Sequence, residues 1–134
     1  MSSIRVKNIN KKIEVNDEGE YIVLPFSDQS FPKRFFELFD SLSKMQKEAE
    51  TKIHDIKDER SLIDFNADIH ERAKEEIDKV FGVGTCKKVF GDIVPGIDMI
   101  QDFFEQLMPF FEEHSKENKK EMKTRFGTVE KSKI

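Results

Sequence analysis

The chain of 134 residues carries a net charge of −4 and contains 13 Phe, one Tyr, no Trp and a single cysteine, Cys86. This length supports one domain with a modest core, and the acidic balance argues against nucleic acid as the main ligand. One cysteine excludes an internal disulfide, and no apolar run reaches the length of a signal-peptide core or of a membrane span, so we expect a cytoplasmic protein.

Residues 4–25 form the strand-like part of the chain. Apolar and polar residues alternate at 13–15, a turn with Gly19 follows at 16–19, and the apolar run 21–24 completes the pattern. This spacing predicts a β-hairpin with a four-residue loop. Residues 4–7 alternate in the same way, so two alternatives are expected: the β-hairpin alone, or a three-stranded meander that includes these residues.

Two long helices are expected next, packed as an antiparallel hairpin. Ser30 suits an N-cap and Pro32 the first turn of the first helix. Its apolar stripe is Phe31, Phe35, Leu38, Leu42, Met45, Ala49, Ile53 and Ile56. We expect a break at 57–61, with Ser61 capping the second helix and Asp64 as the acid of its first turn. The stripe of the second helix is Leu62, Phe65, Ile69, Ala73, Ile77, Val80 and Phe81.

The hinge after these helices contains the Phe-Gly pair twice, at residues 81–82 and 90–91. Each Phe suits the apolar end of a helix, and each Gly can adopt the left-handed conformation that closes it. With Thr85 as N-cap, the segment Cys86–Phe90 is predicted to be a short hinge helix. Neither glycine-rich phosphate-binding motif is present, so we interpret the glycines as helix ends.

A Phe-rich last helix is predicted to start within 92–95 and to be kinked or split at Pro109. From His114 onward the chain is charged, and residues 115–134 carry seven Lys or Arg against three Glu. We therefore expect one mainly α domain (α+β class) over residues 1–114 and a basic, weakly ordered tail over 115–134.

Catalytic chemistry finds little support in the sequence. His54 and His70 could approach each other across the helical hairpin, but no repeated metal-ligand motif accompanies them. Cys86 lies near a predicted helix start beside two lysines, yet no histidine is close in sequence to act as its base. We expect no catalytic, metal-binding or cofactor-binding residues, and no enzyme.

Two stretches resemble the tail assembly chaperones of long-tailed phages and prophages of Gram-positive bacteria. They are the hairpin leading into residues 21–31, YIVLPFSDQSF, and the doubled Phe-Gly element of residues 77–91, IDKVFGVGTCKKVFG, followed by an acidic Phe-rich segment that ends near Phe111. The resemblance covers about residues 4 to 112. It implies a non-enzymatic scaffold in the host cytoplasm that binds the tape measure protein, helps to recruit tail tube protein and is absent from the finished virion.

A chaperone for a long amphipathic helix needs an apolar groove with a charged rim. The candidate protein-binding residues are Phe81, Phe90, Phe103, Phe104, Phe110 and Phe111. Self-association is a further expectation, whereas nucleic acid and membranes are not expected partners. The alternative is a small homo-oligomeric helical-hairpin protein, regulatory or structural, that has no client.

Overall fold

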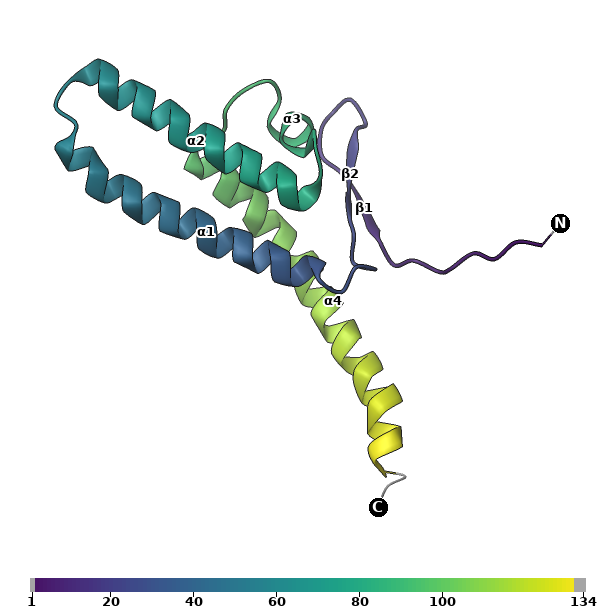
Figure 1. Cartoon of the computed structure of the whole chain (residues 1–134). Coiled ribbons are helices and arrows are strands. Elements are labelled where there is room, and N and C mark those ends of the chain that lie inside the picture. The colour runs from purple at the N-terminus through teal and green to yellow at the C-terminus, as the bar shows by residue number, and fades with distance from the viewer. Residues whose placement is uncertain (1, 132–134) are drawn as a thin grey trace. The chain divides into compact units, whose positions relative to one another are not determined.

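The computed structural model describes residues 2–131, with side chains described to Lys120 and at Met122. The elements in chain order are β1 (Lys11–Glu14), β2 (Tyr21–Leu24), α1 (Phe31–Lys52), the 3₁₀ turn η1 (Ile53–Asp55), α2 (Glu59–Phe81), α3 (Thr85–Phe90) and α4 (Ile97–Lys131) (Figure 1). The chain is thus mainly helical with a small antiparallel sheet, which confirms the predicted fold class. It divides into two compact units, Met1–Met99 and Ile100–Ile134.

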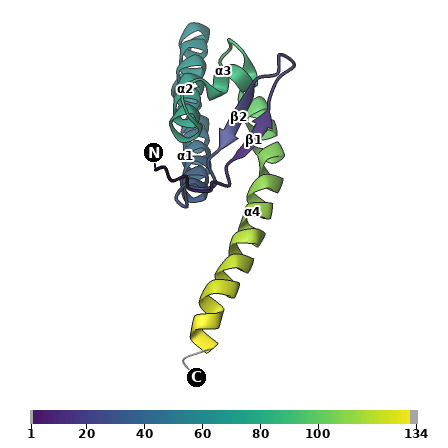
Figure 2. The same ribbon diagram turned by 90° about the vertical axis from the view of Figure 1, so that its right-hand side faces the viewer.

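The two strands form the predicted hairpin, with Lys11 opposite Leu24 and Glu14 opposite Tyr21. The Val15 N–H donates to the Glu20 carbonyl oxygen at 3.0 Å, so the loop has the four expected residues. Figure 2 shows this sheet with β2 beside α3. Of the two predicted alternatives the described chain forms the hairpin: its sheet has two strands, and residues 4–7 do not add the third strand of a meander. An alternating pattern forms a strand only where a neighbouring strand accepts its hydrogen bonds, and no such strand lies beside this segment in the sheet.

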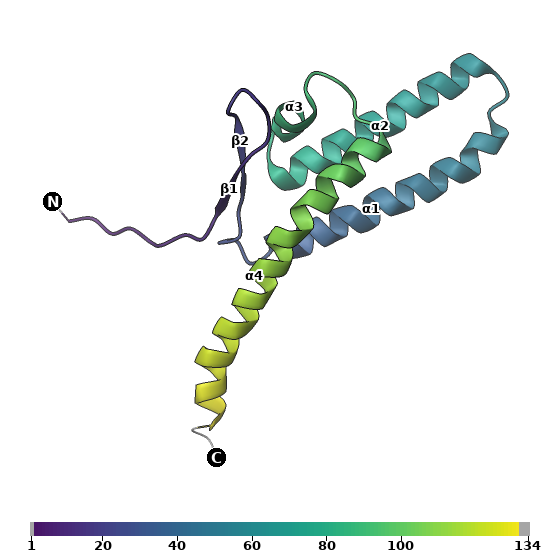
Figure 3. The same ribbon diagram turned by 180° about the vertical axis from the view of Figure 1, so that it is seen from behind.

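Helices α1 and α2 run antiparallel and are joined by a short turn, as Figure 3 shows from behind. The break lies at residues 56–58, earlier than predicted, and Asp58 rather than Ser61 caps α2. The Ser61 N–H donates to Asp58 Oδ2 at 2.9 Å, and this bond is the first cause of the lowered pKa of Asp58. A carboxylate accepts this bond and also carries a negative charge at the positive end of the helix, which favours Asp over Ser.

The base of the helical hairpin is closed by aromatic rings. The Phe81 ring lies 5.7 Å from that of Phe31 and 5.9 Å from that of Phe35, both edge to face. Phe26, from the segment after β2, contacts Phe31 in the same manner at 5.6 Å. Edge-to-face pairs add stability beyond the area they bury. These rings therefore fix the start of α1 against the end of α2.

Burial decreases from this base toward the connecting turn. On α1, Phe31 and Phe35 are fully buried and Met45 is half-buried, and Ile53, the first residue of η1, is 45% exposed. Both predicted stripes therefore face the neighbouring helix, but their residues are more deeply buried near the base of the hairpin than near the connecting turn. The turn-proximal half of the helical hairpin is the less tightly packed half.

The doubled Phe-Gly element closes two helices as predicted, but its glycines combine a positive φ with an extended ψ, 148° at Gly82 and −162° at Gly91, and do not adopt the expected left-handed helical conformation. Gly82 ends α2 with φ 117°, and Gly91 ends α3 with φ 85°. Helix α3 starts one residue earlier than expected, because Gly84, with φ 88°, occupies the N-cap position. Thr85 is consequently the first helical residue and is buried. The Cys86 N–H donates to Asp78 Oδ1 at 2.9 Å, so a side chain of α2 caps the start of α3.

Helix α4 begins at Ile97, later than the predicted start within 92–95. Val94 precedes Pro95, which disfavours helical backbone there, and Gly96 delays the start further. Pro109 lies inside one continuous helix, so the chain is not split at this residue. The helix passes the predicted boundary at residue 114 and reaches Lys131; the weak order expected of residues 115–134 stays a prediction.

Candidate functional site

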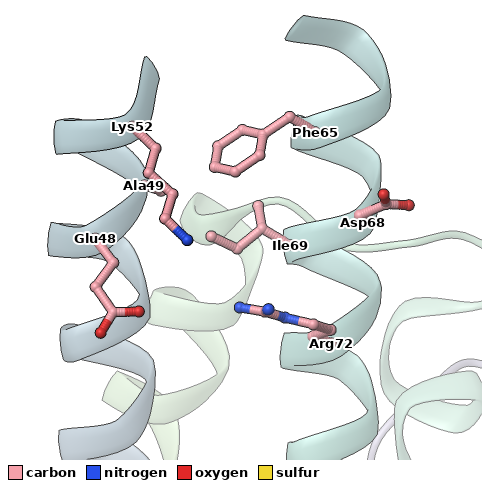
Figure 4. A pocket seen from close by; sticks show the side chains of 7 residues that line it. All are labelled: Glu48, Ala49, Lys52, Phe65, Asp68, Ile69 and Arg72. Atoms are coloured by element: carbon pink, nitrogen blue, oxygen red, sulfur yellow. The ribbon is translucent and has the colours of Figure 1, made fainter. Parts of the chain in front are cut away.

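The less tightly packed half of the helical hairpin contains a cavity between α1 and α2, of about 180 Å³. We call it the hairpin groove; its lining residues are Glu48, Ala49, Lys52, Phe65, Asp68, Ile69 and Arg72. Figure 4 shows Phe65, Ile69 and Arg72 pointing from α2 toward α1, and Lys52 pointing into the gap from α1. The lining thus combines apolar side chains with charged ones, of which Lys52 and Arg72 reach into the gap.

The groove exists because a small residue interrupts the stripe of α1. Ala49 occupies a position where the preceding stripe residues are Phe, Leu and Met. Opposite it, Phe65 and Ile69 reach toward α1 and remain half-buried. Side chains that face a gap lose contact partners on that side, so a guest side chain would recover dispersion contacts and hydrophobic burial.

The size of the groove suits a side chain better than a small-molecule ligand. Typical ligand pockets enclose about 300–1,000 Å³, whereas an apolar cavity of about 150 Å³ accepts benzene. At about 180 Å³, the hairpin groove can take one aromatic or large aliphatic side chain. This geometry matches the anchor residue of an amphipathic helix that docks along two helices.

The rim of the groove is charged but balanced. Glu48 and Asp68 supply two negative charges, and Lys52 and Arg72 supply two positive charges. Within the described part of the chain, no ion pair of 4.0 Å or less joins these four side chains to one another. Charges of both signs can pair with acidic or basic residues that flank an apolar anchor.

The six phenylalanines proposed as protein-binding residues differ in burial. Four are between 4% and 9% exposed: Phe81, Phe103, Phe104 and Phe111. Two are half-buried: Phe90 and Phe110. Phe81 has an evident structural role, since its ring joins α2 to two rings of α1. That these residues bind a partner protein stays a prediction.

Cys86 is fully buried and is not an activated thiol in this structure. Its Sγ donates to the Lys74 carbonyl oxygen at 3.5 Å, and burial, followed by the hydrogen bond and charge of Asp78, raises its pKa to about 12. The neutral thiol is neither the nucleophile nor the metal ligand that cysteine chemistry requires. Cys86 therefore acts as a small apolar residue that packs α3 against α2.

The surroundings of His70 and the search for metal-binding groups bear on the histidines. His70 Nδ1 lies 2.7 Å from the carbonyl oxygen of Asn66, one turn earlier on α2. Among the described residues, no group of three or more His, Cys, Asp or Glu side chains could hold a metal ion. That the protein is not an enzyme remains an expectation.

No helix in the described range 2–131 is both long enough and apolar enough to cross a bilayer.

The hairpin groove is not predicted by the sequence pattern, although Ala49, Phe65 and Ile69 all belong to the apolar stripes. Periodicity shows which residues face a neighbouring helix, but it does not show whether their volumes fill the space between the helices. The available signal was the small Ala49 in a stripe of large residues.

Comparison with known proteins identifies a family to which the chain is similar. The model of a family described as a family of unknown function (DUF6673) matches residues 34–133, which include all but the first turn of α1 and the whole of α2, α3 and α4. No curated protein and no solved structure matches the chain.

Proposed function

The chain belongs to the DUF6673 family, and from its own residues we propose that it is a non-enzymatic tail assembly chaperone of a long-tailed phage or prophage. In this role it binds the tape measure protein and helps to recruit tail tube subunits in the host cytoplasm, and it is absent from the mature virion. The resemblance of the β-hairpin and of the doubled Phe-Gly element to such chaperones supports this function.

The observation that carries the proposal is the hairpin groove. An amphipathic helical client presents large apolar residues at intervals of three and four, flanked by charged residues. One such residue fits the space above Ala49, Phe65 and Ile69, and the flanking charges meet the mixed rim. We therefore place client binding at the open half of the helical hairpin, in addition to the Phe-rich residues proposed from the sequence.

The small size of the groove implies weak binding at each contact. A single anchor side chain contributes about 1.5–3 kcal/mol when fully buried, which alone gives little affinity. A tape measure protein is long and can bind many copies of a small chaperone, so its solubility depends on their number rather than on one tight site. Many weak contacts also release readily when tube subunits take their place.

Co-expression tests the proposal. The tape measure protein encoded near this chain is produced with wild-type protein, with Ile69→Glu or with Ile63→Glu, and the soluble fraction is purified through a tag on the chaperone. Ile69 lines the groove, whereas Ile63 lies on the same helix and is 60% exposed. Glu preserves helix propensity, so the two variants differ in the surface that they change.

We expect the wild type and Ile63→Glu to recover soluble tape measure protein and Ile69→Glu to lose most of it. Circular dichroism and thermal unfolding verify that both variants keep the helical fold. The proposal fails if the client stays insoluble with the wild type, is soluble alone, or is recovered equally by both variants. The homo-oligomeric protein without a client would then be the better interpretation.

A further inference from the structure

The two edges of the small sheet differ in their neighbours within the described chain. β2 lies against α3, where Lys88 Nζ donates to the Tyr21 carbonyl oxygen at 3.3 Å and Asn16 Nδ2 donates to the Lys88 carbonyl oxygen at 3.0 Å. β1 is the other strand of the sheet, and no third strand pairs with it in the described chain. β1 is therefore an edge strand that another strand can extend.

The register of the two strands shows which main-chain N–H and C=O groups face the edge of β1. Val15 and Glu20 form a hydrogen-bonded pair, with the N–H of Val15 donating at 3.0 Å. Hydrogen-bonded and non-hydrogen-bonded pairs alternate along an antiparallel ladder. Lys12 and Glu14 consequently direct their N–H and C=O groups away from β2 and toward the open edge. A two-stranded sheet is marginal in water and gains stability from a third strand.

The chain contains a segment with the side-chain pattern of such a strand. Ile4 and Val6 alternate with polar residues and are 93% and 88% exposed. On the inner face of the sheet, Ile22 and Leu24 are buried, whereas Ile13 of β1 is only half-buried. A strand added beside β1 with Ile4 and Val6 on this face would cover the exposed side of Ile13 and continue the apolar surface.

This segment does not reach the edge of its own sheet. The Ile9 N–H donates to Ser27 Oγ at 2.6 Å, and the Ser27 N–H donates to Asn10 Oδ1 at 3.0 Å. These two bonds hold residues 9–10 beside Ser27, past the end of β2. Residues 3–7 then lead away from the sheet, as Figure 1 and Figure 3 show. Folding back onto β1 would require a reversal at residues 8–10 and the loss of both bonds.

We infer that residues 3–7 pair as an added β-strand with the β1 edge of a second copy of this chain. Two copies related by a two-fold axis can exchange these segments reciprocally, so each completes the sheet of the other. The occupant follows from the chain itself, because it supplies both the exposed strand-like segment and the open edge. This inference does not depend on the client-binding function.

Sedimentation measurements over a range of concentrations test the exchange. The wild type is compared with Ile4→Asp/Val6→Asp and with the control Ile63→Asp/Val83→Asp. All four substituted residues are at least 60% exposed, and both variants add two negative charges. We expect the wild type and the control to reach twice the monomer mass of 15.7 kDa, and the first variant to remain at that mass. A wild type that stays monomeric, or a first variant that still dimerises, would overturn the inference.

A second measurement needs no substitution. Equal amounts of isotope-labelled and unlabelled wild-type protein are mixed, and nuclear Overhauser contacts between the two kinds of chain are selected. We expect contacts between the methyl groups of Ile4 or Val6 in one copy and those of Ile13 in the other. A dimer in which these contacts are missing associates through another surface, and that result also overturns the inference.

Discussion

The buried thiol of Cys86 gives a quantitative prediction for its reactivity. Its pKa of about 12, against an ordinary 9.0, lowers the thiolate population at neutral pH about a thousandfold. A more basic thiolate is also more nucleophilic, which offsets this loss by about 15- to 30-fold. The pKa alone should therefore slow reaction with a disulfide reagent by about 30- to 60-fold. Burial is the largest cause of the raised pKa, so an opening of α3 that admits the reagent also restores an ordinary thiol. The cost of that opening then replaces the pKa effect and does not multiply it.

The matched control places a cysteine in the same hinge but outside the core. Val83 is fully exposed, so Val83→Cys in a Cys86→Ala background should react at the rate of an ordinary thiol. The assay measures the absorbance of the released reagent thiolate for both proteins under identical conditions, and again with sub-denaturing urea. We expect urea to accelerate the wild type and to leave the control nearly unchanged. Equal rates without urea would refute both the burial of Cys86 and the raised pKa.

Three further predictions concern stability, measured by urea unfolding. Gly91 has φ 85° and ψ −162°, a region nearly restricted to glycine, so Gly91→Ala should lower the free energy of unfolding by about 1–3 kcal/mol. The added Cβ of Gly96→Ala meets no atom within 4 Å, so this substitution should be close to neutral. Phe35→Ala should cost about 3–5 kcal/mol because Phe35 is fully buried, while Phe36→Ala, at a side chain 47% exposed, should cost clearly less; equal losses would contradict the assigned face of α1. Folding raises the pKa of Cys86, so its neutral thiol contributes stability below pH 9, and this contribution is lost as the pH rises toward 12. The wild type should therefore lose more stability in this pH range than Cys86→Ala. Parallel curves of stability against pH for the two proteins would contradict this linkage.

Local sequence chemistry predicted those features that depend on one or two residues. The turn with Gly19 and the helix ends at Gly82 and Gly91 follow from the freedom of glycine to adopt positive φ, and each is observed. It was harder to predict which of two nearby polar residues caps the start of α2. Asp58 and Ser61 can both cap a helix, and the order that the chain adopts has Asp58 accepting from the N–H of Ser61.

Features that depend on the volume between elements could not be predicted from periodicity. The stripe assigned Ala49 to the core, yet its small side chain leaves the hairpin groove between α1 and α2. Ile4 and Val6 alternate with polar residues as in a strand, yet residues 4–7 form no strand in the described chain. Strand formation also depends on pairing, and therefore on where the adjoining residues are held. Here the bonds of Ile9 and Asn10 to Ser27 decide it.

The contacts of the unit Met1–Met99 also have a consequence for the order of folding. Most contacting elements are consecutive in the chain: β1 with β2, α1 with α2, and α2 with α3. Such local contacts have a small loop-closure cost and form rapidly. The contact of β2 with α3 joins residues that are 67 positions apart at Tyr21 and Lys88, so it closes a much longer loop than these local contacts do. We expect the helical hairpin to form first and the sheet to dock onto it last, with the released sheet as the first intermediate when the protein unfolds.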